Sequence, residues 1–119
     1  MIENTSSFDE IRAQNVSRAL KWHNGNLLDW SPLEWAGAMC GEAGEAANVA
    51  KKLKRLDTKI IGGLDESDKS RLIQKLADEI ADVFLYLDLL AACYDIDMEL
   101  AIRKKFNEVS DRHEFSERL

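Results

Sequence analysis

The sequence predicts an all-α protein, a bundle of four to five helices. Apolar residues recur every three to four positions along most of the 119-residue chain, which is the spacing of one helix face. One proline and six glycines are too few for the many tight turns of a sandwich or barrel. Four helices with short connections form a bundle. At this length we expect a single domain, residues 1–119.

The first two helices are predicted over 7–23 and 32–56. The first ends because the NGN sequence at 24–26 interrupts its periodicity. The second begins at SPLE, 31–34, where Ser caps the helix, Pro takes the first turn and Glu stands three residues after the cap. The glycines at 37, 41 and 44 lower helix propensity, and small residues in a helix predict close approach by another element.

A long loop is predicted over 57–67, followed by two more helices. The third is expected from a cap at Ser67 or Asp68 to about residue 94, and the fourth over 97–115 with its first residue, an aspartate, as cap. The apolar stripe of the third helix consists of Leu72, Leu76, Ile80, Val83, Leu87 and Leu90. Because the second and third helices are apolar on several faces, we expect a homo-oligomer built from dimers, with a well-packed monomer as the alternative.

Charge and hydropathy exclude several classes of partner. The chain has 22 acidic and 16 basic residues, a formal charge of -6. Binding to the phosphate backbone of a nucleic acid is instead favoured by an excess of Lys and Arg. No window is apolar enough to span a membrane, and the polar N-terminus does not resemble a secretory signal. Cys40 and Cys93 lie in apolar stretches and are predicted to be buried free thiols. We therefore expect a cytoplasmic protein with neither nucleic-acid nor membrane partners.

Two acidic pairs occupy unusual places in the helices. Glu42 and Glu45 lie in the small-residue helix, and Glu79 and Asp82 lie in the apolar third helix. A three-residue step returns to nearly the same helix face, so each pair directs both carboxylates to one place. Four converging carboxylates need a cation, and hard oxygen ligands select Mg²⁺ or Mn²⁺. The alternative is a set of solvated carboxylates in surface ion pairs.

Basic and aromatic residues are placed where a nucleotide would need them. Lys52 follows the second glutamate by seven residues, and Lys105 and Asn107 lie in the fourth helix, so all three are candidates for contacting phosphate. For the lysines near the end of the second helix, the alternative is favourable charge at a helix C-terminus. Trp22 and Tyr86 are candidates for contacting a base, although packing is the usual role of tryptophan.

Four segments carry a resemblance to a known family. They are GEAGEA at 41–46, NVAKKLKR at 48–55, LADEIADV at 76–83 and KFNEVSDR at 105–112. In this order they resemble the motifs of the MazG-like all-α nucleoside triphosphate pyrophosphohydrolases. The region of Asn15, Arg18 and Trp22 is similar to the family's N-terminal substrate-side segment.

The resemblance implies hydrolysis of a nucleoside triphosphate between the α and β phosphates. Glu42, Glu45, Glu79 and Asp82 would then hold Mg²⁺, with Mn²⁺ as the alternative, and carry catalysis. Which carboxylate holds the attacking water stays open. The remaining substrate contacts implied are Lys52, Lys105 and Asn107 to phosphate and Asn15, Arg18, Trp22 and Tyr86 on the base and sugar side.

The resemblance also implies a dimer or tetramer and the removal of surplus deoxynucleotides, with dCTP first and dATP second. The rival hypothesis is a non-catalytic helical interaction module that carries an acidic patch. A di-iron bundle is disfavoured because neither His23 nor His113 stands three residues after a glutamate.

Overall fold

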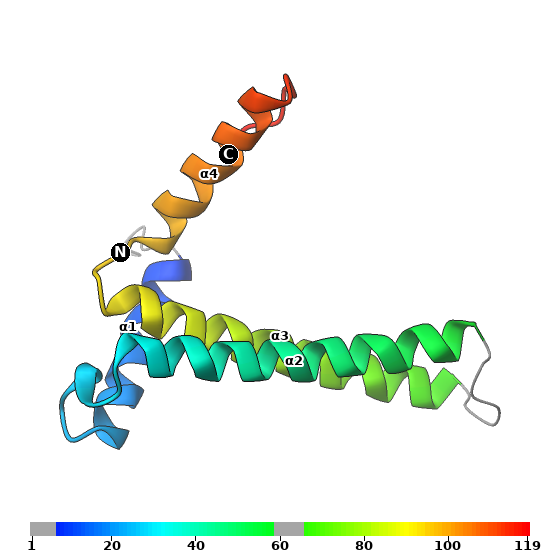
Figure 1. Ribbon diagram of the computed structural model, residues 1–119, viewed down its shortest axis with the longest axis horizontal. Coiled ribbons are helices and arrows are strands. Elements are labelled where there is room, and N and C mark those ends of the chain that lie inside the picture. Colours follow the sequence, from blue (N-terminus) through cyan, green and yellow to red (C-terminus); the bar gives the residue numbers. More distant parts are fainter. Residues whose placement is uncertain (1–6, 59–65) are drawn as a thin grey trace, which may run out of the picture. The chain divides into compact units, whose positions relative to one another are not determined.

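The computed structural model describes residues 7–58 and 66–119. This part of the chain is helical, with no strand (Figure 1), which confirms the all-α prediction. The elements are α1 (Ser7–Trp22), the short 3-10 helix η1 (Leu27–Asp29), α2 (Pro32–Asp57), α3 (Glu66–Ala92) and α4 (Met98–Arg112). They form two compact units, one of Met1–Trp30 with Asp88–Leu119 and one of Ser31–Leu87.

Side-chain caps begin two of the helices where the sequence predicts them. At α2 the Ser31 hydroxyl accepts a hydrogen bond from the Glu34 amide at 3.3 Å, and the Glu34 carboxylate accepts one from the Ser31 amide at 3.3 Å. At α4 the Asp97 carboxylate accepts a hydrogen bond from the Leu100 amide at 3.0 Å. Each cap satisfies backbone N–H groups that have no partner in the first turn.

The start of α3 differs from its prediction. The helix already includes Glu66, so the predicted cap at Ser67 or Asp68 is wrong, and both residues lie in the first turn. Of the loop predicted over 57–67, residue 57 is the last of α2, and residues 59–65 lie outside the described residues.

A residue with left-handed backbone conformation follows the last turn of three helices. These residues are Asn24, Asp95 and Glu114, with φ values of 52°, 52° and 58°. The residue after each donates its amide to a carbonyl five positions earlier, as from Phe115 to Ser110 at 2.8 Å. Because this turn reverses the backbone, α4 ends at Arg112, before the predicted position.

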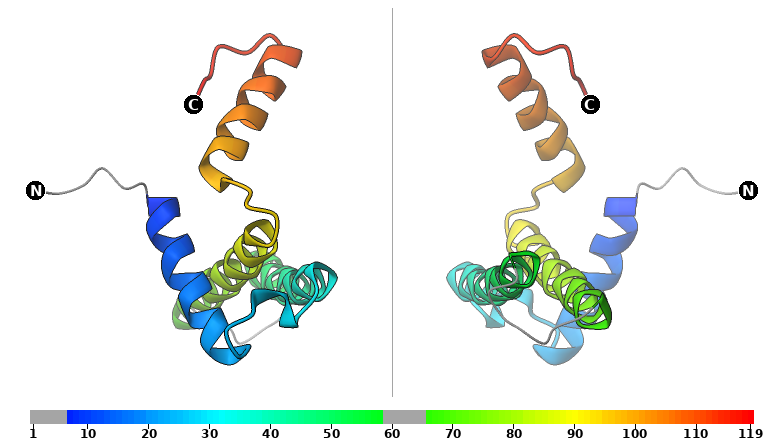
Figure 2. Two further views of the ribbon diagram at one scale, coloured as in Figure 1. Left: turned by 90° about the vertical axis from the view of Figure 1, so that its left-hand side faces the viewer. Right: turned by 90° about the vertical axis from the view of Figure 1, so that its right-hand side faces the viewer.

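In the unit Ser31–Leu87, α2 runs beside the first part of α3 in the opposite direction (Figures 1 and 2). Its buried residues include Trp35, Val49 and Leu72. The ring of Tyr86 lies 6.1 Å from that of Trp35. Ile80 departs from the predicted apolar stripe, since 56% of it is exposed.

Gly41 and Gly44 of α2 have no close neighbour among the described residues of this single chain. A methyl group built on Gly41 or Gly44 would meet nothing within 4 Å in the part of the chain that the structure describes, apart from the helix's own backbone and chain neighbours. Ala43 and Ala47 are exposed. The prediction of a buried thiol is wrong for Cys40, which is exposed in this chain because it lies in the same uncovered stretch of α2.

The other unit is held together around one buried carboxylate. Asp88 is 1% exposed, and its two oxygens accept hydrogen bonds from Arg12 Nε at 2.7 Å and Asn15 Nδ2 at 3.2 Å. Arg12 also donates to the carbonyl of Ile96 at 2.8 Å. This network ties α1 to the end of α3 and to the connection before α4, and it compensates the desolvation of the carboxylate.

Candidate metal centre

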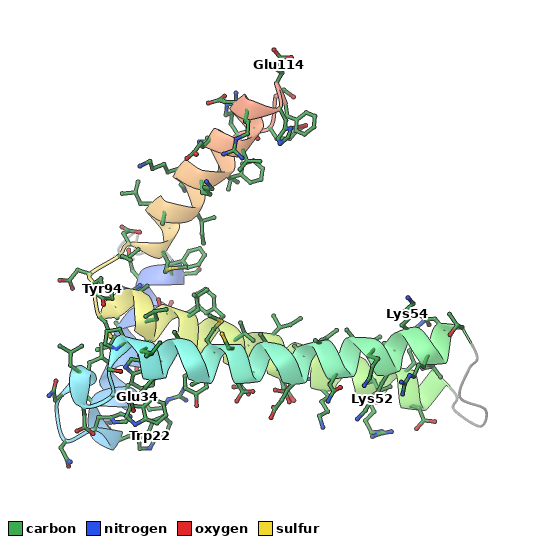
Figure 3. All side chains as sticks on the ribbon, in the orientation of Figure 1. Trp22, Glu34, Lys52, Lys54, Tyr94 and Glu114 are labelled. Atoms are coloured by element: carbon green, nitrogen blue, oxygen red, sulfur yellow. The ribbon has the colours of Figure 1, made fainter. Side chains whose placement is uncertain are left out.

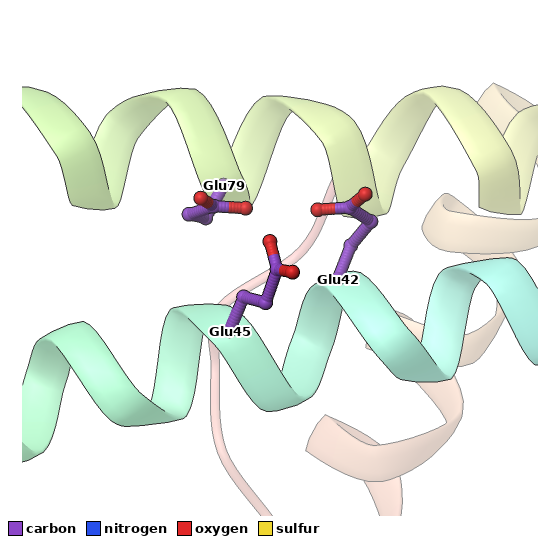
Figure 4. A group of neighbouring side chains, drawn as sticks. All are labelled: Glu42, Glu45 and Glu79. Atoms are coloured by element: carbon purple, nitrogen blue, oxygen red, sulfur yellow. The ribbon is translucent and has the colours of Figure 1, made fainter.

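Three carboxylates converge between α2 and α3. Glu42 and Glu45 reach from α2 and Glu79 reaches from α3, and one oxygen of each lies within 4.8 Å of the others (Figure 4). The three-residue step between the first two places them on one face of α2. Since both helices belong to the unit Ser31–Leu87, the cluster lies within one compact unit.

The carboxylates of the cluster are partly shielded from water, since Glu42 and Glu79 are half-buried and Glu45 is exposed. Glu42 Oε2 and Glu79 Oε2 are buried and have no hydrogen-bond partner among the described residues. The pKa of Glu79 is raised from 4.5 to about 7, first by the Glu42 carboxyl group beside it, then by desolvation and by Glu45. Two orphaned buried oxygens in an all-oxygen donor set fit a hard divalent cation such as Mg²⁺ or Mn²⁺.

Asp82, the predicted fourth ligand, is not in the cluster of three. It is exposed, and it lies three residues after Glu79 on α3. The structure thus brings together three of the four carboxylates that the sequence singles out.

A polar cavity of about 240 Å³ lies beside the cluster. Its lining consists of Glu45, Asn48, Val49, Lys52, Lys75 and Glu79. Lys52 is one of the predicted phosphate contacts, whereas Lys75 was not singled out from the sequence. The available signal was its position four residues before Glu79, which places both on one face of α3.

Three predicted substrate-side residues lie on α1, in the unit of Met1–Trp30 with Asp88–Leu119. Asn15 is buried and its amide group donates to Asp88 at 3.2 Å. Arg18 places its guanidinium 5.3 Å from the centre of the Trp22 ring, a cation–π geometry. Trp22 is 69% exposed.

The last predicted contacts are divided between the units. Lys105 and Asn107 lie on α4, where Lys105 pairs with Glu108 at 3.4 Å and Asn107 exchanges two hydrogen bonds with the backbone of Leu119. Tyr86 is in the same unit as the carboxylates, against Trp35. Lys52 and Tyr86 are therefore the predicted contacts that share a unit with the cluster.

Comparisons with protein-family profiles, with curated proteins and with solved structures found no match for this chain. Among the helices of the described residues, none is both long enough and apolar enough to cross a membrane.

Proposed function

We propose that the chain is a Mg²⁺-dependent nucleoside triphosphate pyrophosphohydrolase of the MazG-like type. The observation that supports this best is the convergence of Glu42, Glu45 and Glu79 within 4.8 Å, with two of their oxygens buried and unpartnered among the described residues. The proposal includes a homo-oligomer, either a dimer or a tetramer built from dimers, which would cover the small-residue face of α2.

The proposed reaction is attack of water on the α phosphorus. A bond forms between the water oxygen and that phosphorus, and the bond from phosphorus to the α–β bridging oxygen breaks. The products are a nucleoside monophosphate and pyrophosphate. Bound Mg²⁺ would neutralise the charge on the phosphate oxygens.

Within this scheme the three glutamates would hold the cation, with Asp82 as the proposed fourth ligand. A carboxylate of the cluster accepts the proton of the attacking water. Lys52, in the adjoining cavity, balances phosphate charge that the cation does not reach.

The proposed substrates are deoxynucleoside triphosphates, with dCTP first and dATP second, in a house-cleaning role. The exposed indole of Trp22 supports stacking on a base, as does the ring of Tyr86 in the unit of the carboxylates.

The experiment that tests the proposal is pyrophosphate release from a panel of dNTPs and NTPs. We expect release with Mg²⁺ and none with excess chelator, and the rates across the panel would identify the base. Release of single phosphate would place the cut at another bond and contradict the proposal.

Variants separate an enzyme from a helical interaction module. Glu42→Gln and Asp82→Asn should abolish turnover and keep the helical circular dichroism spectrum. Asp78→Asn is the matched control, because Asp78 is exposed beside Glu79 and accepts a hydrogen bond from Gln74 at 3.2 Å. No release from any nucleotide would favour the interaction module.

A further inference from the structure

Two lysines line the cavity beside the carboxylates, one from each helix. Lys52 comes from α2 and Lys75 from α3. In the part of the chain that the structure describes, neither ammonium group is among the ion pairs. The lining of the cavity thus combines two carboxylates with two lysines that are outside the ion pairs of the described residues.

Among the described residues, Lys75 differs from the two basic residues that precede it on α3, which are paired. Arg71 pairs with Asp68 at 3.2 Å and Lys69 with Asp57 at 3.3 Å. Lys75 has Glu79 one turn away, at a spacing that normally stabilises a helix. Glu79 instead faces the two glutamates of α2 (Figure 4), which leaves the charge of Lys75 available to a ligand.

Along the two antiparallel helices, aromatic side chains lie on one side of the carboxylates and Lys75 lies on the other. Tyr86 lies seven residues after Glu79 on α3, and Trp35 lies seven residues before Glu42 on α2. Lys75 lies on the other side of the carboxylates, four residues before Glu79. A rise of about 1.5 Å per residue places the aromatic pair about 10 Å to one side of the cluster and Lys75 about 6 Å to the other.

We propose that Lys75 is a substrate-binding residue that, with Lys52, contacts the phosphates that leave as pyrophosphate. This inference rests on the proposed function and deepens it by orienting the substrate. The base lies toward Tyr86, the α phosphate lies at the carboxylates, and the terminal phosphates enter the cavity. The volume of about 240 Å³ suits a small polyanion, since pockets for larger organic ligands begin at roughly 300 Å³.

The test is calorimetric binding of inorganic pyrophosphate in the presence of Mg²⁺. Lys75→Gln should weaken it roughly 10- to 100-fold, the loss of one hydrogen bond between charged groups. Lys75→Arg should retain binding within a few fold, because it keeps the charge. Lys54→Gln is the matched control, since Lys52 and Lys54 project from opposite sides of α2 (Figure 3). Binding of Mg²⁺ alone should not weaken in any of the three variants.

The outcomes distinguish this inference from the function on which it rests. If the wild type hydrolyses nucleotides but Lys75→Gln binds pyrophosphate as Lys54→Gln does, the role of Lys75 is wrong and the proposed function stands. If Lys75→Gln weakens nucleoside monophosphate binding and leaves pyrophosphate binding intact, the orientation is wrong. If the wild type neither binds Mg²⁺ nor hydrolyses any nucleotide, the proposed function fails and this inference fails with it.

Discussion

The carboxylate cluster predicts a defined thermal response to Mg²⁺. A 119-residue chain has an unfolding entropy near its Tm of about 0.25 kcal/mol/K. One ion that binds only the native state adds about 1.4 kcal/mol for each tenfold rise in Mg²⁺ above its Kd. The Tm should therefore rise by about 5–6 °C per decade of Mg²⁺, and by about twice that if two ions bind. At Mg²⁺ concentrations above the Kd, the change in Tm per decade of Mg²⁺ does not depend on the Kd. It therefore reports the number of ions that bind.

The assay is differential scanning calorimetry of the chelator-treated protein over a Mg²⁺ series from 0.1 mM to 10 mM, an interval of roughly two decades. Glu79→Gln removes one of the three converging carboxylates, so we expect it to lose most of the slope. Asp78→Asn should keep the full slope, because its carboxylate lies outside the cluster. An unchanged Tm in the wild type across this range, or an equal slope in Glu79→Gln, would refute the metal centre.

Three further predictions follow from particular contacts. Without metal, Glu79 has its pKa raised from 4.5 to about 7, so the native state binds the proton more tightly than the unfolded chain and loses stability as pH rises through that window. Glu79→Gln has no such carboxylate, so in chelator its Tm should rise relative to that of the wild type from pH 4.5 to 7 and then stay level. A difference in Tm that does not change with pH would contradict the pKa shift. Arg12→Ala leaves the carboxylate of Asp88, 1% exposed, without its cation and should cost about 3–5 kcal/mol in urea denaturation, whereas a loss below about 1 kcal/mol would mean that the pair contributes little. Ser31→Ala removes one half of the capping box and should cost about 1 kcal/mol by the same measurement, with Ser31→Asp as the variant expected to retain stability.

Helix starts were predictable where a short side chain caps its own helix. Ser31 and Asp97 sit within three residues of the amides they bind, so local sequence contains the whole interaction. The start of α3 at Glu66 was not predicted, because three capping residue types, Asp65, Ser67 and Asp68, lie close together in the sequence and local propensity does not choose among them. The end of α4 was placed too late because the reversal occurs at Glu114, with φ 58°, and a glutamate does not indicate a left-handed residue as glycine does.

In the candidate site, too, some features were predictable from local sequence and others depend on how the helices pack. Helical spacing places Glu42 and Glu45 on one face, which is a local property of α2 and can be read from the residues. That Glu79 reaches this face while Asp82 stays exposed depends on how α3 lies against α2. Tertiary packing also explains why Lys75 is outside the ion pairs of the described residues. Its neighbour Glu79, one turn along α3, faces α2 and does not pair with it.

By itself the sequence of this protein determined its all-α class, most of its helix bounds and the identity of its acidic residues. These properties depend on hydrophobic periodicity, capping and spacing over a few residues, all of which are encoded locally. The tertiary structure alone decided which carboxylates converge, that two of their oxygens are buried without partners among the described residues, and that Asn15 donates to Asp88. Those outcomes depend on contacts between residues far apart in the chain, and a single sequence does not specify the register and rotation that bring them together.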